Sequence, residues 1–215
     1  MLNLPKTTVV DKRIPKEKFY GKLDVRADVK RAFVNQVKSI TWRNKIAPST
    51  MNLAPGKQVT EIEIFEIQLK TGVLDETVLR LIDQGIPYHI LFLLEFDEKV
   101  QVWTAYKEVE GKRVTIKPNA YYHTEWMTLD TLPLAVEGLD LDAVYEHFVY
   151  QIAGEALQEK EGESLQESVE RAEQRKKLLQ QIATLQNKIR KEKQLNIQVK
   201  LNQELKQLKK TLEQM

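Results

Sequence analysis

The sequence predicts an α/β (α+β) globular domain with a mixed, largely antiparallel sheet, followed by a C-terminal helical coiled-coil segment. Two β-rich apolar runs, at 59–70 and 88–96, flank a short amphipathic segment that is typical of a helix. Isoleucine and leucine at heptad spacing begin at Leu178. We therefore divide the chain into a basic N-terminal arm (1–22), an α/β domain (23–154) and coiled-coil helices (155–215).

Residues 1–55 are expected to form an arm, one helix and a loop. Two prolines and a basic cluster indicate that 1–20 is an extended arm lying on the domain. Asp24 or Asp28 would cap the helix that follows. Its buried stripe would be Val29, Phe33, Val37 and Ile40. The helix ends before a loop at 44–55 that is rich in Pro, Ser, Thr and Asn.

The segment 59–70 has an alternation that indicates an interior strand. One face carries Glu61, Glu63, Phe65, Ile67 and Leu69. The other carries Ile62, Ile64, Glu66, Gln68 and Lys70. Because each face changes polarity halfway along, the strand either emerges on opposite sides of the sheet at its two ends or has a bulge near Phe65.

The rest of the domain is expected to add two helices and a three-strand meander. Asp75 caps the first helix, which Gly85 ends. The run Tyr88–Phe96 is apolar on nearly all positions of both faces, as in a central strand. The remaining predicted elements are strands 100–107 and 113–117 and a helix from Asp140 or Asp142 to Gly154.

The tail carries two heptad seams, which we expect to bind a partner. The first seam comprises Leu178, Ile182, Leu185 and Ile189. The second comprises Leu201, Leu205, Leu208, Leu212 and Met215. Twelve residues separate Ile189 from Leu201, where an unbroken heptad needs eleven or fourteen. We favour a hairpin that folds back near 191–196, because it pairs the seams internally, over one long helix with a phase shift.

The composition is typical of a soluble protein without disulfides. Hydrophobic residues make up 42% of the chain, and no uncharged apolar run approaches the ~20 residues of a membrane span. The chain has no cysteine, which excludes disulfides, thiolate zinc sites and cysteine nucleophiles. The first ten residues, MLNLPKTTVV, lack the basic region and the following apolar stretch of a signal peptide, so we expect none. We expect a cytoplasmic protein without a membrane partner.

Charge is segregated along the chain, although the net charge is only +2. Residues 1–45 carry 12 Lys/Arg against 4 Asp/Glu, and residues 46–154 carry 8 against 17. Residues 155–173 carry 2 against 7, whereas 174–215 carry 11 against 3. The basic ends could contact DNA, but we favour the simpler interpretation that they dock on the acidic middle or are solvated helix faces. The candidate DNA contacts are Lys12, Arg13, Lys16 and Lys18 in the arm and Arg175, Lys176, Lys177, Lys188 and Arg190 in the tail.

Motifs for cofactors and nucleophiles are absent, so we expect no cofactor and no metal. No glycine-rich phosphate loop or serine elbow occurs, and the three histidines lack metal-ligand spacing. One pattern supports an alternative. Restriction-type nucleases hold Mg²⁺ with an E-x-K or E-x-Q strand, and Glu66-Ile67-Gln68 has this spacing. The residues of this alternative are Glu61, Glu66, Gln68 and Lys70, with Glu95 as the acid from the next strand. We favour the simpler interpretation, that these are solvated polar residues at a strand end.

A second candidate site is the segment 41–53, which we place in the loop before the main strand. It could hold a phosphate or a base through cations, hydroxyls and a stacking indole. The residues concerned are Trp42, Arg43, Lys45, Ser49, Thr50 and Asn52. The alternative is that Trp42 belongs to the core and that Ser49 and Thr50 shape a turn.

Four segments resemble a bacterial family, domain of unknown function four-three-nine-one. They are SITWRNKIAPSTMNL (39–53), VTEIEIFEIQLK (59–70), IPYHILFLLEF (86–96) and EKQLNIQVKLNQELKQLKKTLE (192–213). The resemblance implies no catalytic residues. It implies a genomic context beside helicases, DNA methyltransferases and restriction-type proteins in anti-phage defence clusters.

We therefore expect an accessory subunit that docks on a helicase or methyltransferase partner and is not itself an enzyme. The alternatives are the restriction-type nuclease, with Mg²⁺, and a DNA-binding protein that uses its basic arm and tail. A homodimer through the tail is a further alternative.

Overall fold

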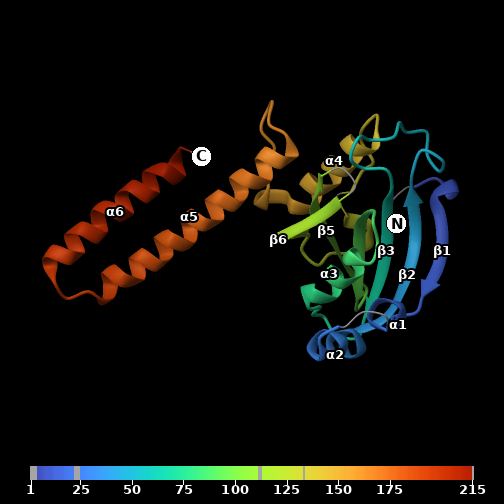
Figure 1. Cartoon of the computed structure of the whole chain (residues 1–215), viewed down its shortest axis with the longest axis horizontal. Helices are drawn as coiled ribbons and strands as arrows, with labels where there is room; N and C mark the ends of the chain where they lie inside the picture. The colour runs from blue at the N-terminus through green and yellow to red at the C-terminus, as the bar shows by residue number, and fades with distance from the viewer. Residues whose placement is uncertain (1–3, 22–24, 111–112, 133, 215) are drawn as a thin grey trace. The chain divides into compact units, whose positions relative to one another are not determined.

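The chain divides into two compact units, Met1–Gly154 and Glu155–Met215. The computed structural model describes residues 4–21, 25–110, 113–132 and 134–214. The first unit is a mixed α+β domain, which confirms the predicted class, and the second contains two closely packed helices (Figure 1). No described helix combines the length and the apolar character that crossing a membrane requires.

The described strands form one six-stranded sheet whose order follows the chain. The strands are β1 (Val9–Ile14), β2 (Val37–Ile46), β3 (Ile62–Leu69), β4 (His89–Phe96), β5 (Lys99–Glu110) and β6 (Arg113–His123). Neighbours are antiparallel except β3 and β4, which are parallel because helix α3 (Glu76–Gln84) connects them. The predicted mixed, largely antiparallel sheet is confirmed, and β3 is an interior strand as its alternation indicated.

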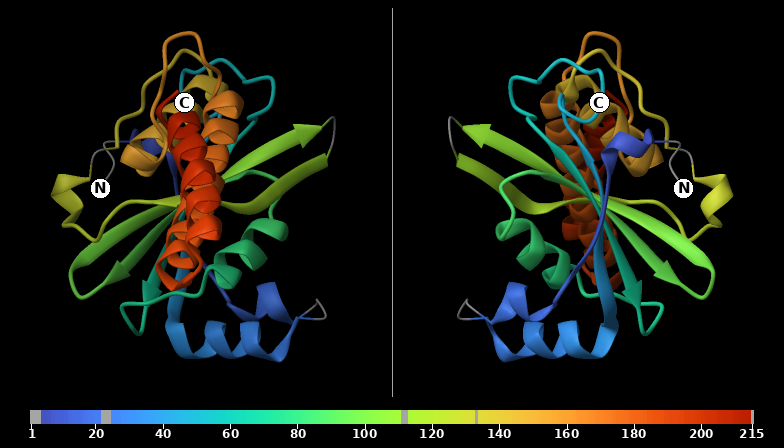
Figure 2. Two further views of the ribbon diagram at one scale, coloured as in Figure 1. Left: turned by 90° about the vertical axis from the view of Figure 1, so that its left-hand side faces the viewer. Right: turned by 90° about the vertical axis from the view of Figure 1, so that its right-hand side faces the viewer.

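Helices pack on both faces of this sheet (Figure 2). The helices of the first unit are α1 (Glu17–Tyr20), α2 (Ala27–Gln36), α3 (Glu76–Gln84) and α4 (Leu141–Ala153), with 3₁₀ turns η1 (Lys6–Thr8) and η2 (Leu129–Thr131). The 3₁₀ turn η3 (Gly154–Ala156) includes the boundary between the two units. Helices α2 and α3 share a core with Phe65 and Phe92. On the opposite face, the Tyr145 hydroxyl of α4 lies 2.9 Å from the Thr104 hydroxyl of β5. Side chains alternate along a strand, so α3 and α4 cover different faces.

One predicted element is wrong, because Val37 and Ile40 belong to strand β2 and not to a helix. Helix α2 ends at Gln36. Phe33, Val37 and Ile40 are all fully buried, as predicted. A helix that runs directly into a strand can bury the same sequence positions as one longer helix. The spacing of the apolar residues therefore did not distinguish the two, although β-branched residues from Val37 to Thr41 favour the strand.

The predicted arm and cap also take a different form in the structure. Residues Val9–Ile14 are strand β1, which pairs antiparallel with β2 at the edge of the sheet. The N-cap of α2 is Arg26, which makes no side-chain capping bond, and Asp28 pairs with that arginine at 2.5 Å. Asp24 lies outside the described residues. Asp75 and Asp140 do cap their helices by accepting hydrogen bonds from backbone N–H groups.

The second unit contains helices α5 (Leu165–Lys191) and α6 (Leu195–Glu213), which lie side by side (Figure 1). The chain turns between them at residues 192–194 without glycine or proline. The Glu192 carboxylate accepts hydrogen bonds from the backbone N–H groups of Lys193 and Gln194 at 2.8 and 2.9 Å. This carboxylate shapes the turn in the way that an Asx side chain does.

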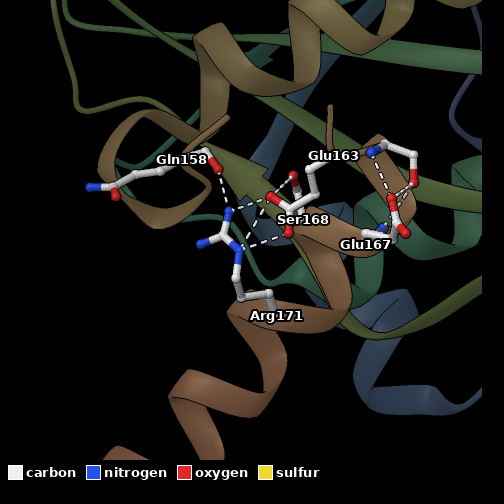
Figure 3. Close-up of polar contacts among 6 residues, drawn as sticks. Gln158, Glu163, Glu167, Ser168 and Arg171 are labelled. Atoms are coloured by element: carbon white, nitrogen blue, oxygen red, sulfur yellow. Dashed lines mark hydrogen bonds and ion pairs between the residues drawn. The ribbon is translucent and has the colours of Figure 1, made fainter. Parts of the chain in front are cut away.

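A polar cluster fixes the segment that leads into α5 (Figure 3). Ser164 and Glu167 form a reciprocal capping box at the start of the helix. Arg171 binds both carboxylate oxygens of Glu163 at 2.9 and 2.7 Å, and its Nη2 donates to the Gln158 carbonyl at 2.6 Å. The bonds from Arg171 are the main reason that the pKa of Glu163 falls to about 2. The arginine thus ties residues 158–163 to the first two turns of α5.

Candidate functional site

The most polar part of the sheet lies where β2, β3 and β4 meet. Gln68 of β3 pairs with Ser39 of β2 and with Glu95 of β4, and Glu66 lies two residues earlier on the same face. The Ser39 hydroxyl donates to the Gln68 side chain at 2.9 Å. Glu66 is only 3% exposed. Burial, and next the charge of Glu66, raise the pKa of Glu95. The structure thus places two carboxylates on adjacent strands in a low-dielectric position.

Arg43 supplies the countercharge to this cluster. Its Nε lies 2.5 Å from Glu66 Oε2, and its Nη1 lies 2.5 Å from Asp11 Oδ1. The pairing of β2 with β3 shifts register between Trp42 and Asn44, which makes Arg43 the extra residue of a bulge. The bulge lies opposite Phe65, near the position where the polarity of β3 changes. The hydrogen bond to Glu66 raises the pKa of Arg43, so the guanidinium remains charged.

A second group of polar contacts involves the other face at the beginning of β3. Trp42 Nε1 donates to Glu63 Oε2 at 2.6 Å, and Lys45 pairs with Glu61 at 2.7 Å. Trp42 also stacks on Phe65, with ring centroids 6.4 Å apart. Burial raises the pKa of Glu63 to about 7, against the opposing effect of the Trp42 bond. Glu63 is therefore a buried carboxyl group that titrates near neutral pH.

The predicted nuclease residues are only partly brought together. Glu66 and Gln68 share a face beside Glu95. Glu61 belongs to the other face, and Lys70 follows the end of β3, where its ammonium donates to the Val34 carbonyl at 2.7 Å. Among the described residues, no group of three or more His, Cys, Asp or Glu side chains is arranged to hold a metal ion.

The predicted ligand-binding loop is wrong as an element, because Trp42, Arg43 and Lys45 lie on strand β2. Thr50 belongs to the turn after β2, where its hydroxyl donates to the Lys45 carbonyl at 2.8 Å and accepts from the Ala47 N–H at 2.9 Å. Ser49 and Asn52 are exposed. The cations of this segment are thus paired with carboxylates of the same sheet, and Thr50 shapes a turn.

Nearly the whole chain matches a known protein family. A family model described as Domain of unknown function (DUF4391) matches residues 2–212. The chain belongs to this family. No curated protein and no solved structure matches it.

In the tail of this DUF4391 member, the side chains of the two predicted heptad seams are buried to different extents. Ile182 and Leu185 are buried, whereas the other described seam residues are half-buried. Those are Leu178, Ile189, Leu201, Leu205, Leu208 and Leu212. Met215 lies outside the described residues. The basic tail residues are exposed on α5, and they are Arg175, Lys176, Lys177, Lys188 and Arg190.

A buried charge cluster in this DUF4391 domain was not predicted from the sequence. Lys107 Nζ of β5 lies 2.7 Å from Asp83 Oδ1 of α3, and both side chains are at most 1% exposed. The Tyr121 hydroxyl donates to the other Asp83 oxygen at 2.5 Å, and Lys107 also donates to the Tyr88 carbonyl. Burial raises the pKa of Tyr121, which therefore keeps its proton. One signal was available in the sequence. Asp83 lies four residues after Leu79 and therefore on the same, apolar face of the helix, which indicates a buried carboxylate.

Proposed function

We propose that the protein is an accessory interaction subunit of a bacterial DNA-processing or anti-phage defence complex. In this proposal α5 and α6 act as a coiled-coil hairpin that docks on a helicase or methyltransferase of the same gene cluster. The genomic context implied by the family resemblance supports the choice of partner. The observation that carries the proposal is the incomplete coverage of the seam.

Two helices alone leave much of this seam in contact with solvent. No described residue of α6 is buried, although four leucines lie at heptad spacing on the side that faces α5. Beside the seam, at the beginning of α6, two further apolar side chains are exposed: Leu195 to 72% and Val199 to 50%. Burying such area is worth ~25 cal/mol per Å², so a third helix along the seam would be stabilised by apolar contact.

The charge of the hairpin indicates the chemistry of its partner. Residues 174–215 carry 11 Lys/Arg against 3 Asp/Glu. A second copy would bring the same basic surface to the seam, and like charges disfavour that pairing. We therefore favour a partner helix with acidic flanks over a homodimer.

Co-purification of the co-expressed neighbouring helicase or methyltransferase tests this proposal. The double variant Leu195→Glu/Val199→Glu should lose the partner, because it places carboxylates on the apolar surface. Leu139→Glu is the matched control, since Leu139 is 91% exposed in the other unit. Loss of the partner in both variants, or in neither, would contradict the proposal.

The restriction-type nuclease is a second candidate, supported by the position of Glu66 and Gln68 beside Glu95. The two carboxylates would be the Mg²⁺ ligands, and Gln68 would orient the attacking water. Cleavage of DNA in Mg²⁺ should then be lost in Glu66→Gln and retained in Glu61→Gln, which removes a carboxylate from the other face. Absence of cleavage with every divalent metal tested would eliminate this candidate.

A further inference from the structure

A small cavity lies where the end of β1, the start of α1 and the start of β2 meet. Its volume is about 350 Å³. The lining residues are Arg13, Ile14, Pro15, Lys16, Glu17, Lys38 and Ser39. Three of these side chains are cationic and one is acidic. The cavity therefore has a strong positive charge in a unit whose larger part, residues 46–154, is acidic.

The positive charge of this cavity is not balanced by nearby carboxylates. Lys16 Nζ donates to the Val37 carbonyl at 2.7 Å, and Lys70 Nζ donates to the Val34 carbonyl at 2.7 Å. Both ammonium groups thus rest on backbone at the end of α2. Burial, and next the charge of Lys70, lower the pKa of Lys16 against the opposing effect of Glu17.

The remaining cations of the cavity have no acidic partner among the described residues. Arg13 and Lys38 are exposed, and neither forms an ion pair with any residue that the structure describes. The one lining carboxylate, Glu17, accepts a hydrogen bond from the Tyr20 hydroxyl at 3.3 Å. Lys16 and Lys70 have a structural role, because they satisfy carbonyls at a helix C-terminus. That role does not extend to Arg13 and Lys38.

We propose that this cavity binds a backbone phosphate of DNA, with Arg13 and Lys38 as the ion-pairing groups. Guanidinium and ammonium groups are the usual protein partners of phosphate oxygens. Lys12 and Lys18, which lie next to lining residues in the sequence, are exposed as well. DNA offers several phosphates to such a set of cations, whereas free phosphate offers one. The site is independent of the docking proposed for α6.

Binding of a fluorescent 20-base-pair duplex to the full chain at several salt concentrations tests this inference. The variant Arg13→Gln/Lys38→Gln removes the contact with one phosphate, so its log–log salt slope should be shallower by about 0.9. Between 50 and 200 mM salt the wild type should therefore lose about 3.5-fold more affinity than the variant. Arg13→Lys/Lys38→Arg keeps the charge and should bind nearly as the wild type does.

Two control variants distinguish this cavity from the other cationic surfaces of the chain. Lys99→Gln removes an exposed cation elsewhere in the first unit, and Arg175→Gln/Lys176→Gln removes cations of the tail. In either control background, adding Arg13→Gln/Lys38→Gln should make the salt slope shallower by the same amount as in the wild type. The inference is overturned if the Arg13/Lys38 variant binds DNA with the wild-type slope or if the wild type does not bind DNA. It is also overturned if inorganic phosphate at millimolar concentration binds the site and DNA does not.

Discussion

Replacing Glu63 with glutamine should stabilise the domain at alkaline pH and have little effect near pH 4.5. Glu63 is only 3% exposed, and the cost of burying its charge raises its pKa to about 7 from the ordinary 4.5. Below pH 4.5 the carboxyl group is protonated in both the folded and the unfolded protein. Between pH 4.5 and 7 the unfolded chain loses this proton while the folded protein keeps it. The free energy of unfolding therefore falls as the pH rises through this window.

The size of the effect follows from the two pKa values. The difference between about 7 and 4.5 corresponds to about 3 kcal/mol, since each tenfold change in proton affinity is worth ~1.4 kcal/mol. Glutamine has no charge to bury, and its side-chain oxygen can still accept the Trp42 hydrogen bond that Glu63 accepts at 2.6 Å. The variant should thus exceed the wild type by up to ~3 kcal/mol at pH 8.

Urea unfolding followed by tryptophan fluorescence, at intervals from pH 4.5 to 8, measures this difference. Comparing variant with wild type at each pH cancels the titration of other groups. Glu98→Gln, in the exposed turn between β4 and β5, is the control and should give the same stability as the wild type throughout. A Glu63→Gln difference that is independent of pH, or that is unfavourable at pH 8, would show that Glu63 is not a destabilising buried charge.

Three further predictions concern stability. Lys107→Met removes the countercharge of the buried Asp83, so it should lower the free energy of unfolding by ~3–5 kcal/mol in urea titrations, whereas exposed Lys99→Met should not. Asp142→Ala should speed amide hydrogen exchange at Val59, because the Asp142 carboxylate accepts from the N–H groups of residues 57–59 at 2.6 to 3.1 Å; unchanged exchange would contradict this. Leu185→Ala should cost ~2–3 kcal/mol in thermal melts of helical circular dichroism, and Leu179→Ala, which is 44% exposed, should cost much less.

The elements that local pattern determines were predictable from the sequence. The strand at 59–70, the helix capped by Asp75 and the apolar strand near 88–96 are all present. Each of these segments has its own local signal, either a hydrophobic pattern or a helix cap, that distinguishes it from the elements on both sides. Val37 and Ile40 were misassigned because their burial is compatible with a helix and with a helix–strand junction alike. Periodicity does not resolve a junction of this kind.

Contacts between distant residues were not predictable in the same way. The approach of Lys107 to Asp83 depends on how α3 packs across the sheet, and the position of Asp83 in the stripe of Leu79 does not identify Lys107 as its partner. The same holds for Arg43, whose bulge places it beside Glu66. A charged residue in a β-rich run indicates only that some partner is needed if the side chain is buried.

The two candidate sites found in the sequence prove to be opposite halves of one set of cross-strand contacts. Residues from the supposed ligand loop, on β2, neutralise or hydrogen-bond the acidic residues of the supposed nuclease strand, β3. Groups that satisfy one another have less free energy to gain from a ligand, since binding must first break the existing contacts. The stronger candidates for function are therefore the groups that the fold leaves without partners. In the described chain these are the half-covered seam of α5 and α6 and the cations around Arg13 and Lys38.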